Sequence, residues 1–431
     1  MLKQFLETTF KLRENKTSVR LELMAGLTTF MTIAYILAIN PSILSKAGMD
    51  AGAVFMATAL AACLGTLFMA VFANYPFALA PGMGLNAFFA YTVVGQMGYS
   101  WQVALTAVFI EGIIFILLSI TKVREEIFNC IPPALKYGVT SGIGLFIAFI
   151  GLQNAKIVID GPFLVALYPF KTALANGEFY STGIGALLAM IGILMTAVLT
   201  AKKFSGAILY GIIFTWILGI FCEITGVYVP NPALGMHSVL PDFSLGVGIP
   251  SVAPTFMQFD FSAVMSFNFV AVMLSFMFVD LFDTIGTLIG VASKAKMLDK
   301  DGKLPRVRGA LLADAMATTC GAVLGTSTVT TTVESSAGVA AGGRTGLTAL
   351  TVAALFLLSI FFAPLFLAVP LFATAPALVI VGFSMFSSML NIDFNDLSEA
   401  IPAFIAAVAM PFTYSISEGI SMGIISYVII N

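Results

Sequence analysis

The sequence is poor in charged residues, histidine and cysteine. Charged residues make up 10% of the 431 positions, whereas a soluble domain carries about a quarter. Hydrophobic residues make up 59%, so the chain could not cover its surface with polar groups in water. We therefore expect a polytopic membrane protein, mostly built of α-helices.

The scarcity of histidine and cysteine argues against common metal and disulfide sites. The single histidine, His237, falls in a predicted loop, where a surface role is favoured. The four cysteines lie at wide spacings in or beside apolar runs, a pattern that gives neither a disulfide framework nor a zinc site. The net charge of −2 does not indicate nucleic-acid binding. We expect no cofactor.

Apolar runs predict fourteen membrane segments, seven on each side of a proline-containing loop at 226–262. The first half, 21–225, has segments near 21–40, 53–73, 76–95, 103–120, 132–152, 182–200 and 206–225. The second half, 263–431, has segments near 263–292, 308–325, 332–343, 346–368, 371–389, 399–412 and 415–430. Residues 1–20 precede both halves. The 332–343 segment is too short to cross a bilayer alone.

Lysine and arginine residues fall mainly on one side of these segments. With the N-terminus in the cytoplasm, seventeen lie in cytoplasmic segments, and only Lys46, Lys156 and Lys171 lie outside. This asymmetry follows the positive-inside rule. We expect a multi-pass protein of the cell membrane, plasma or inner, with a cytoplasmic N-terminus.

Glycine interrupts one segment in each half, at matching positions. The third segment reads ALAPGMGLNAFFAYTVVG (78–95), and the tenth lies within GTSTVTTTVESSAGVAAGGRTG (325–346). A half with an odd number of spans, when repeated, inserts with inverted topology. Inverted repeats with discontinuous helices are typical of secondary transporters. A plain kinked helix with a packing role is the alternative.

The stretch TSTVTTTV (326–333) favours a strand over a helix. Extended backbone cannot face lipid, because its amide groups would lack partners, so the strand must pair inside the protein. We expect GLNAFF (84–89) as that partner, giving short antiparallel strands in segments 3 and 10. The small residues SSAGVAAGG (335–343) are expected to form a half-helix that begins beside Glu334.

Acidic residues occur inside predicted membrane segments, where a charge costs on the order of 3 kcal/mol or more. They are Glu111, Asp280, Asp283, Asp314 and Glu334. Asp280 and Asp283 are three residues apart and share a helix face, so one of them would tend to hold a proton. Such a pair suits proton coupling. Capping, or pairing with a hydroxyl, is the structural alternative.

Structural roles are favoured for other polar residues in the membrane segments. We expect Asp314 to pair with Arg306 or Arg308 near the inner end of its span. Glu111 is expected to bond another helix. Asn40 ends the first span and is a candidate either for a polar contact or for a helix cap.

The acids also restrict the type of ligand. Glu334 and Asp283 accept hydrogen bonds when ionised and donate them when protonated. They suit a neutral ligand with several N–H groups, such as a purine or pyrimidine base. Phe88 or Phe278 is a candidate to stack on its ring, with lipid-facing packing as the alternative for either.

Three motifs resemble those of the nucleobase–cation symporters (xanthine/uracil permease-like), in particular the AzgA-like branch of adenine, guanine and hypoxanthine permeases. They are APGMGLNAFFAY (80–91), FVDLFDTIGTLIG (278–290) and TSTVTTTVESSAGVAAGGRTGLTAL (326–350), and the resemblance covers nearly the whole chain. It implies an all-α fold of fourteen segments in two inverted repeats. Spans 1–4 and 8–11 would form a core domain, and spans 5–7 and 12–14 a gate domain. It also implies a homodimer and proton coupling.

The resemblance implies a substrate site between the short strands of spans 3 and 10. The two acids that bind the base in the family match Asp283 and Glu334, and the span-one asparagine matches Asn40. The xanthine and uric acid branch carries Glu-x-x-Gly-Asp in span eight. Here the residues are Asp283 to Thr287 with neither acid of that pattern in place, which leaves adenine, hypoxanthine and guanine.

The expected mechanism assigns a role to each group in this site. Glu334 receives N–H groups of the base, and Asp283 binds the imidazole side. The backbone of Ala87, Phe88 and Val333 completes the contacts. Coupling protons are expected at Asp283 and Glu334, with Asp280 as a further candidate. The core then moves against the gate and exposes the site alternately.

The nearest alternative is an anion transporter on the same fold. Its site would offer cationic groups or helix N-termini, so Glu334 and Asp283 argue against it. A uracil or xanthine permease and a channel are disfavoured. An intramembrane enzyme is also disfavoured, because the Walker ending and metal-ligand spacings are absent from the sequence.

Overall fold

The computed structural model describes residues 7–121, 123, 132–161, 164–204, 206–231, 238–240, 249–294, 297 and 304–431. Within these residues, ten helical segments are long and apolar enough to cross a membrane. Two shorter apolar helices follow near the C-terminus. The chain is therefore a mostly helical polytopic membrane protein, as predicted. His237, Cys130 and part of the basic loop at 294–308 lie outside the described residues.

The first half of the chain contains nine described α-helices. They are α2 (Val19–Ile33), α3 (Ile36–Leu44), α4 (Ala51–Phe68), α5 (Met83–Ala87), α6 (Trp101–Thr121), α8 (Pro133–Asn154), α9 (Phe170–Ala175), α10 (Gly183–Ala201) and α11 (Ala207–Ile224). Short 3-10 or π-helical turns extend or connect them: η1 (Ser45–Ala47), η2 (Met69–Ala73), η3 (Phe88–Gln96) and η4 (Glu178–Tyr180). Strands β1 (Leu79–Pro81), β2 (Val158–Asp160) and β3 (Val165–Leu167) complete this half.

The described part of the second half has one strand, β4 (Val329–Thr331). Its helices are α12 (Phe267–Lys294), α13 (Val307–Leu324), α14 (Ser335–Ala340), α15 (Gly346–Ser359), α16 (Ala363–Leu367), α17 (Leu371–Phe386), α18 (Leu397–Thr413) and α19 (Ile416–Ile430). The 3-10 turns η6 (Ile360–Phe362) and η7 (Ser387–Asn391) follow α15 and α17.

Several helices begin where a side chain caps free backbone amides. The Asp50 carboxylate accepts from the amide of Ala53 at 2.7 Å at the start of α4. Thr345 caps α15 in the same way. At the other end, Gly325 terminates α13 with a φ of 97°, which favours glycine. These local signals place the helix ends close to the predicted boundaries.

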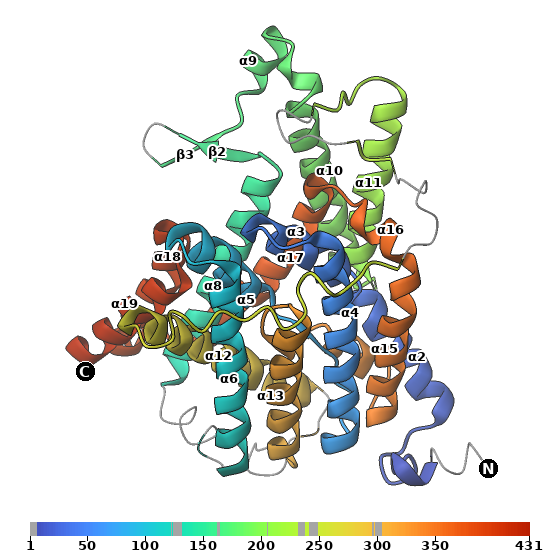
Figure 1. The fold of residues 1–431 in the computed structure, drawn as a ribbon, viewed down its shortest axis with the longest axis vertical. Helices are drawn as coiled ribbons and strands as arrows, with labels where there is room; N and C mark the ends of the chain where they lie inside the picture. The colour runs from blue at the N-terminus through green and yellow to red at the C-terminus, as the bar shows by residue number, and fades with distance from the viewer. Residues whose placement is uncertain are drawn as a thin grey trace.

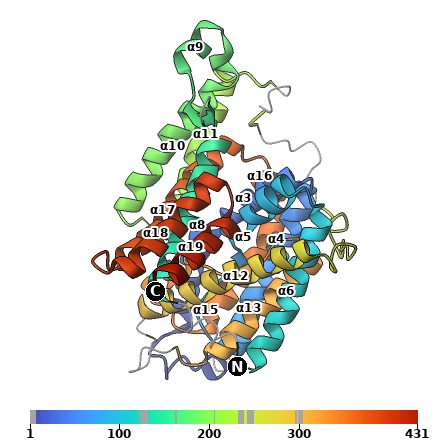
Figure 2. The ribbon, with the colours of Figure 1, turned by 90° about the vertical axis from the view of Figure 1, so that its left-hand side faces the viewer.

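The helices pack as two sets. In one, α13 packs between α4 and α6, and α15 packs on α2 and α4 (Figure 1). In the other, α17 packs on α8, α10 and α11, and α18 packs on α8 and α19. Figure 2 shows α10, α11 and α17 on one side of the molecule and α4, α6 and α13 on the other. Fewer contacts join the sets, among them α5 with α8 and α3 with α17.

Strands β1 and β4 form the expected antiparallel pair inside the first set. Ala80 lies opposite Thr330, flanked by Leu79 opposite Thr331 and Pro81 opposite Val329. Two further backbone bonds extend the pairing symmetrically: the amide of Gly82 donates to Thr328 at 3.1 Å, and that of Thr332 donates to Ala78 at 3.0 Å. The bonds are related by a local two-fold axis through the Ala80–Thr330 pair.

Hydroxyl groups close the outer edges of this two-stranded sheet. The hydroxyl of Thr66, on α4, exchanges hydrogen bonds of 2.9 and 3.1 Å with the backbone of Leu79. On the opposite edge, the Thr318 hydroxyl, on α13, donates to the carbonyl of Val329 at 2.9 Å. Backbone groups that would be costly to leave unpaired in a membrane are thereby satisfied.

The predicted partner strand was wrong. We expected 84–89 to pair with the tenth segment, but the pairing residues are Leu79–Pro81, and Met83–Ala87 forms the helix α5. The strand ends just before Gly82, which is the N-cap of α5. From there the backbone forms helical hydrogen bonds, beginning with that from the amide of Asn86 to the carbonyl of Gly82. The predicted half-helix at 335–343 is present as α14, Ser335–Ala340, and ends before Gly342 at a φ of 108°.

Close approach of α8 and α17 depends on two glycines. A Cβ on Gly144 would lie 2.5 Å from the carbonyl oxygen of Gly382, and a Cβ on Gly382 would meet that of Gly144. Both neighbours are backbone, which cannot move aside without separating the helices. Small residues at such crossings are typical of membrane helix packing.

We expect Gly144→Ala to lower the free energy of unfolding by about 1–3 kcal/mol, because the added methyl group overpacks the crossing. The thermal midpoint of the purified protein in detergent measures this. Gly95→Ala is the matched control, since its Cβ would be 3.4 Å from the nearest atom, an ordinary contact. Equal midpoints for the two variants would show that the helices tolerate a wider crossing.

Candidate functional site

Glu334 lies where β4 gives way to α14. It directly precedes Ser335, the first residue of that helix, and its side chain is half-buried. The Tyr35 hydroxyl, between α2 and α3, donates to Glu334 Oε1 at 2.5 Å. Thr32 donates to the Glu334 carbonyl at 3.3 Å. The neighbouring Val333 is 41% exposed. The junction thus presents a fixed carboxylate at an accessible position.

Asp283 approaches the same strand pair from α12, which packs on β4 and α14. A Cβ on Gly82 would lie 3.2 Å from Asp283 Oδ2 and 2.7 Å from the Thr330 methyl group. The missing side chain of Gly82 therefore lets the turn between β1 and α5 pack against the acid. Asp283 and Glu334, predicted as the two site acids, are both placed at the broken segments.

A buried polar network lies beneath the strands. Thr284 Oγ1 is 2.9 Å from Asp280 Oδ1 and 3.0 Å from both carboxylate oxygens of Asp314. It is also 2.6 Å from the hydroxyl of Thr330, on β4. The amide of Thr331 donates to Asp314 Oδ1 at 3.2 Å. All of these side chains are buried. The pairing of Asp280 with a hydroxyl, considered as a structural role, is therefore present.

The expected arginine partners of Asp314 contact other groups. Arg306 lies over the ring of Tyr75, with its Cζ 4.8 Å from the centroid, and Arg308 donates to the carbonyl of Ile120. Asp314 lies deeper in α13 than predicted and is bonded to Thr284, because the strand pair brings α12 beside it. Glu111 does bond another segment, as expected: the Thr328 hydroxyl donates to its Oε2 at 3.1 Å.

Two asparagines join the broken segments to the helices around them. Asn40 Nδ2 donates to the hydroxyls of Thr58 at 2.7 Å and Thr326 at 2.8 Å. It lies inside α3, so the helix-cap alternative was wrong. Asn86, on α5, accepts from the Ser327 hydroxyl. Within the described residues, Asn40 Oδ1 and Asn86 Nδ2 are buried without a hydrogen-bond partner.

The remaining predicted site residues surround these acids. Ala87 ends α5, and Phe88 follows it at the start of η3, both buried. The Phe88 ring packs edge-on against Phe276, with centroids 4.8 Å apart. Phe278 is half-buried against the main apolar core. A stacking role for either ring stays a prediction.

Comparison with known proteins assigns the family. A sequence profile described as the Permease family, of the xanthine/uracil type, matches residues 20–422. The chain belongs to this permease family. It is therefore a transport protein of the membrane and not an enzyme.

Relatives of the permease match over almost their whole lengths. A putative permease of Methanocaldococcus jannaschii is 50% identical, covering 100% of this chain and 93% of its own. The guanine/hypoxanthine permease PbuO of Bacillus subtilis is 47% identical, covering 98% and 93%. The adenine permease AdeQ of Escherichia coli is 43% identical, covering 98% and 90%.

A solved structure shares the fold of the permease. The transmembrane domain of the cyanobacterial bicarbonate transporter BicA aligns with a TM-score of 0.65, covering 94% of this chain and 97% of its own. Sequence identity is 18%, so this likeness concerns the fold alone.

Three residues that contact the candidate site were not predicted as site residues from sequence. Tyr35 contacts Glu334 across 299 positions, and Thr284 contacts Asp314 across 30. Asn86 contacts Ser327 across 241. The only sequence signal was the presence of polar groups inside apolar segments, and Asn86 stands in the GLNAFF motif itself.

Proposed function

We propose that the permease is a secondary active transporter that imports purine nucleobases, namely adenine, hypoxanthine and/or guanine, across the cell membrane. The observation that carries this is Glu334, a half-buried acid at the junction of β4 and α14, held by Tyr35 beside the exposed Val333. A carboxylate there accepts N–H groups of a flat, neutral base. The adenine and guanine/hypoxanthine permeases among the relatives support the substrate class.

In this proposal the base lies between the two broken segments. Its Watson–Crick edge donates to Glu334, and its imidazole side meets Asp283. Backbone of Ala87, Phe88 and Val333 supplies further contacts, as in other sites built from discontinuous helices. Phe88 or Phe278 covers one face of the ring.

Proton coupling is proposed at the acids of α12 and their neighbours. The Thr284 hydroxyl has one proton but is within hydrogen-bond distance of both Asp280 and Asp314. It can donate to only one of them, and the second contact is favourable when that carboxyl group is itself protonated. The network thus suits a proton that is bound and released, next to the predicted coupling acids Asp283 and Glu334.

Alternating access is proposed as motion of the first helix set, the core, against the second set, the gate. The predicted fourteen segments in two inverted repeats are supported by the local two-fold symmetry of the β1–β4 bonds, in which Gly82 to Thr328 mirrors Thr332 to Ala78. We further propose a cytoplasmic N-terminus, a location in the plasma or inner membrane, and a homodimer. Anion transport is not favoured, because two carboxylates lie at the site.

The test of the proposed function is uptake in cells that lack their own base permeases. Labelled adenine and hypoxanthine should enter saturably, compete with each other and with guanine, and lose accumulation when a protonophore is added. Uptake that is unaffected by the protonophore would contradict proton symport. Saturable flux of sulfate or bicarbonate, with no purine uptake, would contradict the substrate class.

We expect Tyr35→Phe to raise the KM for base uptake roughly tenfold, because the hydrogen bond that orients Glu334 is lost. The protein should reach the membrane in normal amounts, since the ring is retained. Concentration-dependent uptake measures the change, with Tyr210→Phe, a partly exposed tyrosine on α11, as the matched control. An unchanged KM would show that Glu334 is held without Tyr35.

A further inference from the structure

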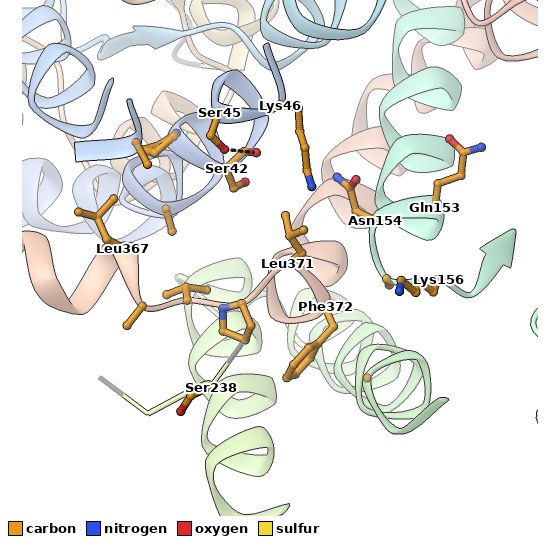
Figure 3. Close-up of a pocket in the computed structure, with 18 of the residues that line it drawn as sticks. Ser42, Ser45, Lys46, Gln153, Asn154, Lys156, Ser238, Leu367, Leu371 and Phe372 are labelled. Carbon is orange, nitrogen blue, oxygen red and sulfur yellow. Dashed lines mark hydrogen bonds between the residues drawn. The ribbon is translucent and has the colours of Figure 1, made fainter. Parts of the chain in front are cut away.

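A cavity lies between the two helix sets, and none of the acids already described lines it. It has a volume of about 590 Å³ and lies between α3, η1 and α16 on one side and α8, α10 and α17 on the other (Figure 3). Lys46 and Lys156, both predicted to lie on the external side of the membrane, are among its lining residues. The cavity is therefore a candidate first binding site for solutes that arrive from outside, called the external station below.

Basic and amide groups supply the polar part of the wall. Lys46, on η1, extends into the cavity toward Asn154, at the end of α8 (Figure 3). Lys156 and Gln153 also line it. Burial lowers the pKa of Lys156, and the positive charge of Lys46 lowers it further. The two ammonium groups therefore lie close enough to repel each other. No aspartate or glutamate is among the described residues that line the cavity.

The rest of the wall is apolar and suits a flat ring. Leu371 and Phe372 of α17 project into the cavity near Lys46 (Figure 3), and Tyr228 and Leu367 are also among the lining residues. Mostly apolar pockets with a few placed polar groups are typical of small-molecule sites. This wall complements a ligand with a planar body and an edge of hydrogen-bond acceptors.

Two lining residues connect the cavity to the segments that hold the candidate site. Ala38 lines it and is three residues, about one helical turn, beyond Tyr35 in the chain. At the other wall, Asn154 lies 3.4 Å from the hydroxyl of Tyr91, which follows Phe88 on η3. This bond joins the cavity lining directly to the segment that contains Phe88.

We propose that this cavity is an external station that binds 6-oxopurines, guanine and hypoxanthine, through their O6 and N7 acceptors, with Lys46 as the residue that selects them over adenine. The inference rests on the proposed function and concerns a different site. O6 and N7 form an acceptor pair to which lysine donates in nucleic-acid recognition. Adenine presents an amino donor in place of O6, and an ammonium group has only donors to offer.

The test compares initial uptake of hypoxanthine and adenine by the full-length protein. Lys46→Met should raise the KM for hypoxanthine roughly tenfold and leave that for adenine within about twofold. Lys46→Arg keeps the charge and the donors and should restore hypoxanthine uptake. Lys171→Met is the matched control, because Lys171 is an exposed lysine on α9 that does not line the cavity. Membrane abundance is measured for every variant.

The outcomes separate this inference from the proposed function. A wild-type protein that takes up neither base overturns both. If the wild type takes up both bases and Lys46→Met has an unchanged KM for hypoxanthine, the proposed function is not contradicted, but the inference of an external binding site is. An equal rise for both bases also overturns it, because the lysine would then support structure and not selection.

Discussion

Glu334→Gln should reduce saturable purine uptake by about 100-fold or more. The glutamine keeps an oxygen for the Tyr35 hydroxyl, which lies 2.5 Å from Oε1 in the wild type. It replaces the other carboxylate oxygen with an amide donor, which in the proposed site is directed at the N–H groups of the base. The loss of one or two charge-assisted hydrogen bonds, each about 1.5–3 kcal/mol, corresponds to a change of this size. Initial uptake of labelled hypoxanthine and adenine measures it.

Glu14→Gln is the matched control, because the Glu14 side chain is 70% exposed in the N-terminal segment. It should transport like the wild type. Surface labelling must show equal amounts of both variants in the membrane. Normal uptake by Glu334→Gln would remove Glu334 from the site, and with it the proposed role of the β4–α14 junction.

Thr284→Val should reduce proton-driven uptake at least about tenfold and destabilise the protein by about 1–3 kcal/mol. Valine has nearly the shape of threonine but cannot bond Asp280 and Asp314, which lie 2.9 and 3.0 Å from the hydroxyl. Removing a buried hydrogen-bonding partner carries a cost of this order. Proteoliposomes with an imposed pH gradient measure transport, and thermal unfolding in detergent measures stability.

Thr284→Ser separates the hydroxyl from the methyl group. It keeps the bonds to both acids and should retain uptake within about twofold. If the valine variant unfolds at the same temperature and accumulates base with the same pH dependence, the network has no part in coupling. Destabilisation with unchanged coupling would assign it to structure alone.

The membrane made much of this fold predictable from sequence. Apolar length alone located the helices: the run predicted at 103–120 is α6, Trp101–Thr121, and that at 206–225 is α11, Ala207–Ile224. Backbone chemistry in lipid also required the strand-like tenth segment to pair with another broken segment, and β4 does pair with β1. Bilayer thickness restricts the length of each helix, and the need for backbone hydrogen bonds restricts which strands pair.

Register and side-chain partners were not predictable in the same way. The choice between Leu79–Pro81 and 84–89 as the strand depends on where a short helix begins, and local preference over so few residues is weak. Asp314 was predicted to pair with nearby arginines, because a sequence shows how far apart charged residues are along the chain. It does not show the distance between residues on different segments. Its bonds to Thr284 and Thr331 arise only after α12, α13 and β4 have packed.

The pairing of β1 with β4 also affects the biogenesis of the protein. Ala80 lies opposite Thr330 and Ala78 accepts from the amide of Thr332, so this pairing forms only after the ribosome has made both segments. Closing so long a loop is a slow, late event compared with forming local helix contacts. The Leu79 backbone bonds the Thr66 hydroxyl, which belongs to the first half and is made earlier. A nascent chain halted before β4 therefore contains the complete first half and still lacks the partner of β1.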